Sequence, residues 1–163
     1  NEFAKAIAAH GGNASEEIVA GALRYQLLKV KIGSDVVFDI NEAVSLTGNT
    51  GSYLQYAHAR ARRILEKSTV AAAFPAAIYD EDRALVRKLT EYREIIELAA
   101  DSLEPHHICA YLFELAQEFN RYYEKNQVIG SGKEAHRAGL VAVYADILKA
   151  GLTILGIVAP DKM

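Results

Sequence analysis

Two tyrosines in the first half of the chain have a spacing that could bring their rings together for binding. Tyr53 and Tyr56 follow the glycine-containing segment GNTG and are three positions apart, so a helix places them on one face. A tyrosine ring can stack on an unpaired nucleobase, which contributes about 1–3 kcal/mol per base. The alternative is burial in the core, the commoner fate of helical aromatic residues.

A stripe of positive charge follows the two tyrosines. Arg60, Arg63 and Lys67 are related by i, i+3 and i+7, so they share one side of the same helix. Guanidinium groups bind phosphate through two hydrogen bonds and also stack on bases. Flat rings beside such a stripe are typical of single-stranded RNA recognition, so we predict an RNA-binding surface here. The alternative is a solvated face whose cations pair with nearby acidic residues.

Other candidate sites are less specific. Glu104 and His107 form one Glu-x-x-His pattern, with His106 between them. Because a metal site needs several converging ligands, we predict no metal centre, and we expect both histidines to be exposed at the start of a helix. The segment GSGK lacks the spacing of a phosphate-binding loop. Cys109 is predicted to be a small core residue, and no catalytic residue is assigned.

Composition limits the classes of protein to consider. The chain has 163 residues, a net charge of −3 and a single cysteine. A length of this kind suits one domain with a proper core. No apolar run reaches the roughly 20 residues of a membrane span, and the N-terminus does not resemble a signal peptide, so we expect a cytoplasmic protein. The net charge does not predict a polyanion partner, so any nucleic-acid site must be a local patch.

Apolar residues recur at helical spacing through most of the chain. Ser15 is expected to cap a first helix that continues towards Val30. Further helices are expected over residues 57–73, 80–100, from 105 to about 123, and 134–155. Only Asp35–Ile40, with the sequence DVVFDI, predicts a strand, which must be an extended connector or have partners outside this chain. The predicted fold class is all-α, a helical bundle preceded by a short mixed tail.

Several separated motifs, in order along the chain, resemble arginyl-tRNA synthetases. The stretch DVVFDINEAVSLTGNTGSYLQYAHARARRIL resembles the junction between the catalytic core and the anticodon-binding domain of that class I family. PHHICAYLFELAQEFNRYYEKNQVI resembles its middle helices, and ILKAGLTILGIVAPDKM resembles its C-terminal helix and terminal methionine. The resemblance implies that residues 1–50 are a C-terminal tail of the catalytic core. It implies that residues 51–163 form an α-helical anticodon-binding domain of the DALR type.

The resemblance also implies an activity for a longer protein. Such an enzyme joins arginine to its tRNA with ATP and Mg²⁺, and its arginine activation requires bound tRNA. The His-Ile-Gly-His-like and Lys-Met-Ser-Lys-Ser-like activation motifs of the family are missing from this chain, so we expect the chain alone to be inactive and to hold no cofactor. The implied partners are the anticodon loop of tRNA(Arg) and the missing catalytic and N-terminal domains of the same chain. A monomer is expected.

The family's site residues are carried over by motif. Tyr53 and Tyr56 match its Tyr-Leu-Gln-Tyr motif as base-packing groups, and Tyr123 is matched through Tyr-Tyr-Glu-Lys-Asn. Met163 matches the terminal methionine that packs near the anticodon. Arg60 and Arg63 are predicted to hold phosphates, which rests on the helical stripe rather than on the family.

Two departures and two alternatives accompany this interpretation. Ser52 stands where the family usually has proline, and Lys162 stands where it usually has arginine. Lysine at this position keeps the positive charge and lacks the planar guanidinium that binds phosphate through two hydrogen bonds. One alternative function is a helical protein–protein interaction module without RNA binding. The other is the anticodon-binding domain of a related class I synthetase, such as the cysteine enzyme.

Overall fold

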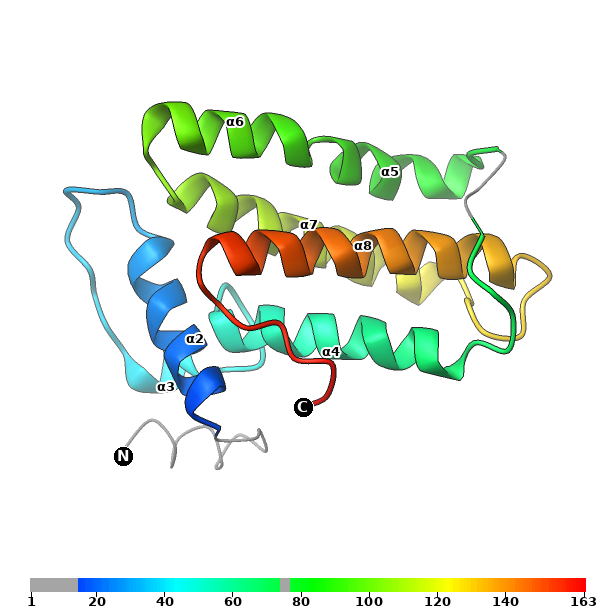
Figure 1. The fold of residues 1–163 in the computed structure, drawn as a ribbon, viewed down its shortest axis with the longest axis horizontal. Coiled ribbons are helices and arrows are strands. Elements are labelled where there is room, and N and C mark those ends of the chain that lie inside the picture. Colours follow the sequence, from blue (N-terminus) through cyan, green and yellow to red (C-terminus); the bar gives the residue numbers. More distant parts are fainter. Residues whose placement is uncertain (1–14, 74–76) are drawn as a thin grey trace.

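The computed structural model describes residues 15–73 and 77–163, and every regular element within them is helical (Figure 1). No helix in this described part is long and apolar enough to cross a membrane. The predicted all-α fold class is therefore confirmed. The helices are α2 Glu16–Leu28, α3 Ile40–Ala43, α4 Gly51–Lys67, α5 Arg83–Thr90, α6 Tyr92–Ser102, α7 His106–Lys125 and α8 Glu134–Ile154, with a 3-10 turn at Asp80–Asp82.

The long helices α7 and α8 form the middle of the bundle, with α4 on one side and α5 and α6 on the other (Figure 1). The rings of Phe119 and Tyr144 stack in the centre, with centroids 3.9 Å apart. Leu112 and Leu148 are fully buried around them. Cys109 is buried too, and burial raises the pKa of its thiol to about 12, so it is a core residue as predicted.

Helix α2 crosses the start of α4, and the crossing depends on small residues. A Cβ atom at Gly51 would lie 2.8 Å from both the Gly21 carbonyl oxygen and the Tyr25 Cβ, so the two backbones could not approach as closely with a larger residue. The hydroxyl of Tyr25 donates to the Cys109 carbonyl oxygen at 2.9 Å and ties α2 to α7. As predicted, the Ser15 hydroxyl oxygen caps α2 by accepting from the Ile18 N–H.

The predicted strand at Asp35–Ile40 is wrong. Residues 35–39 form no strand, and Ile40 is already the first residue of α3. At the end of this segment, the Asp39 carboxylate accepts hydrogen bonds from the N–H groups of Asn41 and Glu42 at 2.7 and 3.2 Å. This cap starts a helix where the apolar run predicted extended pairing. Within the described residues the segment is a connector between α2 and α3.

Two helix boundaries also differ from the prediction. Helix α4 begins at Gly51 and ends at Lys67, because the next residue, Ser68, takes an extended conformation and its hydroxyl donates to Glu134 of α8 at 2.9 Å. The expected helix over 80–100 is divided between α5 and α6 around Glu91. There the Thr90 hydroxyl donates to the Arg87 carbonyl oxygen at 2.8 Å, a local bond that competes with the regular helix pattern.

A buried carboxylate joins three separate parts of the bundle. Asp82 is 1% exposed, and one of its oxygens accepts from the Tyr122 hydroxyl of α7 at 3.1 Å. The other oxygen accepts from the Tyr79 N–H at 3.1 Å and lies 2.7 Å from Nε2 of His136 on α8. Because buried polar groups are costly without partners, this cluster sets how α5, α7 and α8 meet at that end.

Candidate nucleic-acid interface

The candidate interface lies along α4. The Thr50 hydroxyl oxygen caps this helix by accepting from the Tyr53 N–H at 3.0 Å. Its buried side, with Leu54, Ala61 and Ile64 among other residues, packs into the core. The helix therefore keeps its opposite side, with the cationic stripe, towards solvent.

The C-terminal segment runs back along α4 and forms one wall of the interface (Figure 1). The Gln55 amide donates to the Val158 carbonyl oxygen at 2.9 Å, and Nδ1 of His58 lies 2.8 Å from the Pro160 carbonyl oxygen. Burial lowers the pKa of His58, which favours the neutral imidazole in this contact. These contacts fix the direction in which the last residues of the chain leave the bundle.

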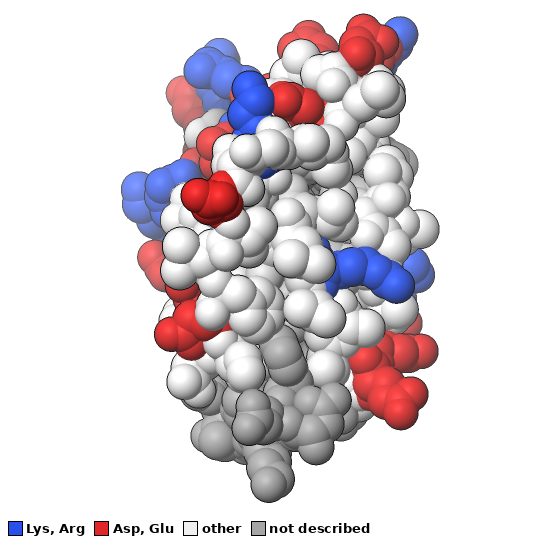
Figure 2. Space-filling view, turned by 90° about the vertical axis from the view of Figure 1, so that its left-hand side faces the viewer, with Lys and Arg blue, Asp and Glu red and all other residues white. Residues whose placement is uncertain are grey.

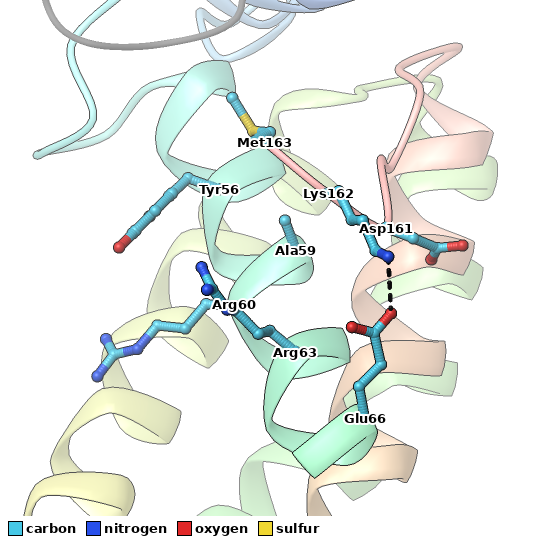
Figure 3. A pocket seen from close by; sticks show the side chains of 8 residues that line it. All are labelled: Tyr56, Ala59, Arg60, Arg63, Glu66, Asp161, Lys162 and Met163. Atoms are coloured by element: carbon cyan, nitrogen blue, oxygen red, sulfur yellow. Dashed lines mark ion pairs between the residues drawn. The ribbon is translucent and has the colours of Figure 1, made fainter.

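Two ion pairs continue the attachment towards the end of the chain. Arg62 pairs with Asp161 at 3.2 Å. Lys162 pairs with Glu66 at 3.7 Å (Figure 3). Met163 packs against a small apolar cluster that contains Ile18. The terminal methionine is thereby held beside α4.

A hollow of about 360 Å³ lies between α4 and this terminal segment, and we call it the Met163 pocket (Figure 3). Its volume is at the lower end of the range for small-ligand sites. Its lining residues come from both walls, namely Tyr56, Ala59, Arg60, Arg63, Glu66, Asp161, Lys162 and Met163. Tyr56 is 42% exposed, so its ring is available to a ligand.

A second hollow of about 250 Å³ adjoins the first and shares Arg60 and Arg63 with it, and we call it the Tyr123 pocket. Its other lining residues are Ile64, Lys67, Tyr123 and Ile129. The structure thus places Arg60, Arg63 and Lys67 in one continuous groove. That arrangement agrees with the stripe expected from their spacing.

The two arginines in this groove differ in their surroundings. Arg60 donates to Oδ1 of Asn120 at 3.2 Å, and its guanidinium lies 5.1 Å from the centre of the Tyr123 ring. Arg63 is exposed and, in the described part of the chain, has no ion-pair or hydrogen-bond partner on its side chain. One cation is therefore held in place by the protein, and the other is available to an incoming anion.

Tyr53 has a different environment from Tyr56. Its ring packs edge-on against Phe113 at 5.9 Å, and its hydroxyl accepts from Nδ2 of Asn120 at 2.8 Å. Burial raises the pKa of Tyr53. Of the predicted residues, Tyr56, Arg60, Arg63, Tyr123 and Met163 come together in the groove, whereas Tyr53 is not among the residues that line it.

Asn120 is the residue that inspection of the sequence missed. Its amide contacts Tyr53 and Arg60 at once and so links α7 to α4. The available signal was its spacing, because Asn120 and Tyr123 are at i and i+3 on α7 and share a face. That signal gives no partner on α4, since the partner depends on how the two helices pack.

The two histidines lie at the start of α7 as expected, but they are partly covered rather than exposed. His106 and His107 keep only 21% and 30% of their side-chain surface, and both face Glu104. The centre of the His106 ring lies 4.2 Å from the centre of the His107 ring, so each ring covers part of the other.

The sequence and fold were compared with known proteins. The family described as the DALR anticodon binding domain matches residues 54–163, more than half of the chain. The chain belongs to this DALR family. Curated relatives include arginine–tRNA ligases from Frankia casuarinae, 39% identical over 148 residues, and Geobacter metallireducens, 40% identical over 160 residues. These alignments cover 88% and 91% of the chain, and only 25% and 28% of the two relatives.

The fold supports the same relationship. An arginyl-tRNA synthetase structure from Thermus thermophilus matches 99% of the chain with a TM-score of 0.89 and 31% sequence identity. The chain covers 31% of that protein. The chain therefore spans between a quarter and a third of the length of these three proteins.

Proposed function

We propose that this DALR domain is the part of an arginine–tRNA ligase that binds the anticodon loop of tRNA(Arg). The groove on α4 carries the proposal, because it combines an exposed ring at Tyr56, an unpaired cation at Arg63 and a second ring at Tyr123. Unpaired bases stack on such rings, and phosphates bind such cations. Met163 would pack against a nucleotide from the opposite wall, and Tyr53 would support the groove through Asn120, which it shares with Arg60.

We further propose that the whole protein joins arginine to tRNA(Arg) with ATP and Mg²⁺, and that activation takes place in parts outside this chain. The family match begins at residue 54, which supports a boundary near residue 50 between a tail of the catalytic core and the anticodon-binding domain. Cytoplasmic location and a monomeric state remain predictions.

An apolar face supports contact with those other parts of the enzyme. The side formed by α2 and the connector after it has a broad central area without charged side chains (Figure 2). Exposed apolar residues on these segments include Leu23, Leu27, Ile32 and Val37. Such a face marks an interaction surface. Because the chain covers about a quarter of its relatives, we propose the missing domains as the partner, in preference to a separate protein.

The experiment that tests the RNA proposal is direct binding. A labelled anticodon stem-loop of tRNA(Arg) is titrated with the chain, and fluorescence anisotropy is measured at several salt concentrations. We expect weak, salt-dependent binding that exceeds binding to a stem-loop of equal length with a different anticodon. Equal affinity for the two stem-loops at every salt concentration would contradict anticodon recognition. No salt-dependent binding to either stem-loop would favour the alternative of a protein–protein module.

Replacement of Arg63 by alanine tests the phosphate contact. Loss of one phosphate contact should weaken binding similarly for all sequences and reduce the slope of log K against log salt by about 1. Arg93→Ala is the matched control, since Arg93 is an exposed arginine on α6 whose partner is Glu97. A slope that is the same in wild type and Arg63→Ala would assign no phosphate to this residue.

Replacement of Asn120 by leucine tests how Arg60 is held. Without the amide, Arg60 loses its 3.2 Å acceptor and Tyr53 loses its donor, so we expect RNA binding to weaken roughly 5- to 10-fold, equivalent to one net hydrogen bond. Asn120→Asp, which keeps the acceptor for Arg60, should recover most of the affinity. Equal affinities for the leucine and aspartate variants, both with a wild-type melting temperature, would exclude a positioning role.

A further inference from the structure

The turn between α6 and α7 brings together three side chains whose chemistry the groove does not use. Oε2 of Glu104 lies 3.4 Å from Nε2 of His107 and 3.8 Å from Nδ1 of His106. One potential ligand atom from each of the three residues lies within 4.8 Å of the other two. Two imidazoles and one carboxylate form a donor set that zinc accepts in proteins, with water in the remaining position.

Two of the three separations are close to those around a tetrahedral zinc ion, and the third, between the two imidazoles, is within 4.8 Å. Zinc–ligand bonds of about 2.0–2.2 Å at tetrahedral angles put neighbouring ligand atoms roughly 3.3–3.6 Å apart. The pair from Glu104 to His107 is already in that range, and the pair from Glu104 to His106 exceeds it by a few tenths of an ångström. Side-chain rotation alone can close a difference of this size.

The backbone holds the ligands in this arrangement without a metal. Leu103 ends α6 in the left-handed conformation, with φ of 57°, and the Glu104 N–H donates to the Ala99 carbonyl oxygen at 3.1 Å. The His107 N–H donates to the Glu104 carbonyl oxygen at 3.3 Å. Little backbone conformational entropy would therefore be lost on binding, which favours a preorganised site.

An unsatisfied nitrogen provides an independent indication of a ligand. Nδ1 of His106 is buried and has no hydrogen-bond partner within the described residues. A buried polar atom of this kind is uncommon and costs free energy unless something binds it. The atom faces the Glu104 carboxylate at 3.8 Å. A bound metal ion would lie between them.

We propose that Glu104, His106 and His107 bind one zinc ion and fasten the turn between α6 and α7. Two features of the surroundings weaken zinc binding at this site. Lys31 lies 3.6 Å from the other oxygen of Glu104, and the positive end of the α7 dipole is nearby. The lysine side chain is 65% exposed, so it can leave when the metal enters.

The site is independent of the proposed RNA groove. His106 and Tyr123 are 17 residues apart on α7, which corresponds to about 25 Å along the helix. The result of a zinc-binding experiment therefore does not depend on whether the groove binds tRNA.

Isothermal titration calorimetry with zinc chloride tests the proposal on the chain after treatment with a chelator. We expect one zinc ion per chain, and a roughly 10- to 100-fold weaker affinity in Glu104→Gln and in His107→Gln. Glu94→Gln, a change to an exposed acid on α6, should bind zinc like wild type. Lys31→Gln should bind several-fold more tightly because the competing cation is gone.

Cobalt(II) provides a second measurement that does not depend on affinity. In the wild type it should give the visible absorption of a four- or five-coordinate ion, and Glu104→Gln should lose that spectrum. Circular dichroism checks that each variant is folded. Wild-type zinc affinity in both Glu104→Gln and His107→Gln, or a cobalt spectrum unaffected by Glu104→Gln, would overturn the assignment.

Discussion

Asp82→Ala is expected to lower the free energy of unfolding by about 3–5 kcal/mol, the loss found when one partner of a buried charged cluster is removed. The carboxylate is 1% exposed and accepts from the Tyr79 N–H and the Tyr122 hydroxyl, with Nε2 of His136 at 2.7 Å. Its removal leaves these groups without an acceptor in a place that is closed to bulk water. The effect should be large because three parts of the bundle lose their common contact together.

Urea denaturation at neutral pH provides the measurement, with the midpoint and the slope determined for each variant. Asp80→Ala is the matched control, since Asp80 is two residues away, 92% exposed and paired only with Arg83 in the described structure. An exposed pair of this kind contributes little, so the control should lose at most about 1 kcal/mol. Similar losses in the two variants would show that the buried cluster does not hold this end of the bundle.

Tyr56→Ala is expected to weaken binding of the tRNA(Arg) anticodon stem-loop by about 1–3 kcal/mol, which corresponds to roughly 5- to 150-fold. Tyr56 is 42% exposed in the Met163 pocket, so the change removes a stacking surface and little core packing. Anisotropy titration measures the effect on the chain, and the specificity constant for tRNA measures it in the full-length enzyme.

Tyr56→Phe is the control for this prediction because it keeps the ring and removes only the hydroxyl. If stacking dominates, the phenylalanine variant should stay within about threefold of wild type. A loss in Tyr56→Phe as large as in Tyr56→Ala would assign the effect to the hydroxyl instead. Unchanged binding in a folded Tyr56→Ala variant would remove the residue from the interface.

Local spacing was sufficient to predict the two longest helices and part of the groove. Apolar periodicity indicated α7 and α8 to within a few residues, because both helices have a long buried stripe. The i, i+3, i+7 spacing of Arg60, Arg63 and Lys67 indicated their common side of α4 for the same reason. A helix has a constant rotation per residue, so positions on one helix need no information from the rest of the fold.

Two predictions from sequence spacing were wrong because a single residue changed the local structure. The apolar run DVVFDI predicted a strand, but the Asp39 cap starts a helix at its end and no partner strand is present in the described residues. Exposed histidines were expected at the start of α7, but the left-handed Leu103 turns the chain so that Glu104 meets them. Both outcomes depend on hydrogen bonds or turn geometry that hydrophobic periodicity does not report.

The sequence by itself determined which residues share a helix face, and so determined that Tyr56, Arg60 and Arg63 would lie near one another. Only the tertiary structure decided that Tyr53 is covered by Phe113, and that Asn120 holds Arg60. It also decided that the C-terminal segment forms the second wall of the Met163 pocket. These contacts join residues more than fifty positions apart, and their geometry is set by how α4, α7 and α8 pack rather than by the spacing within any one helix.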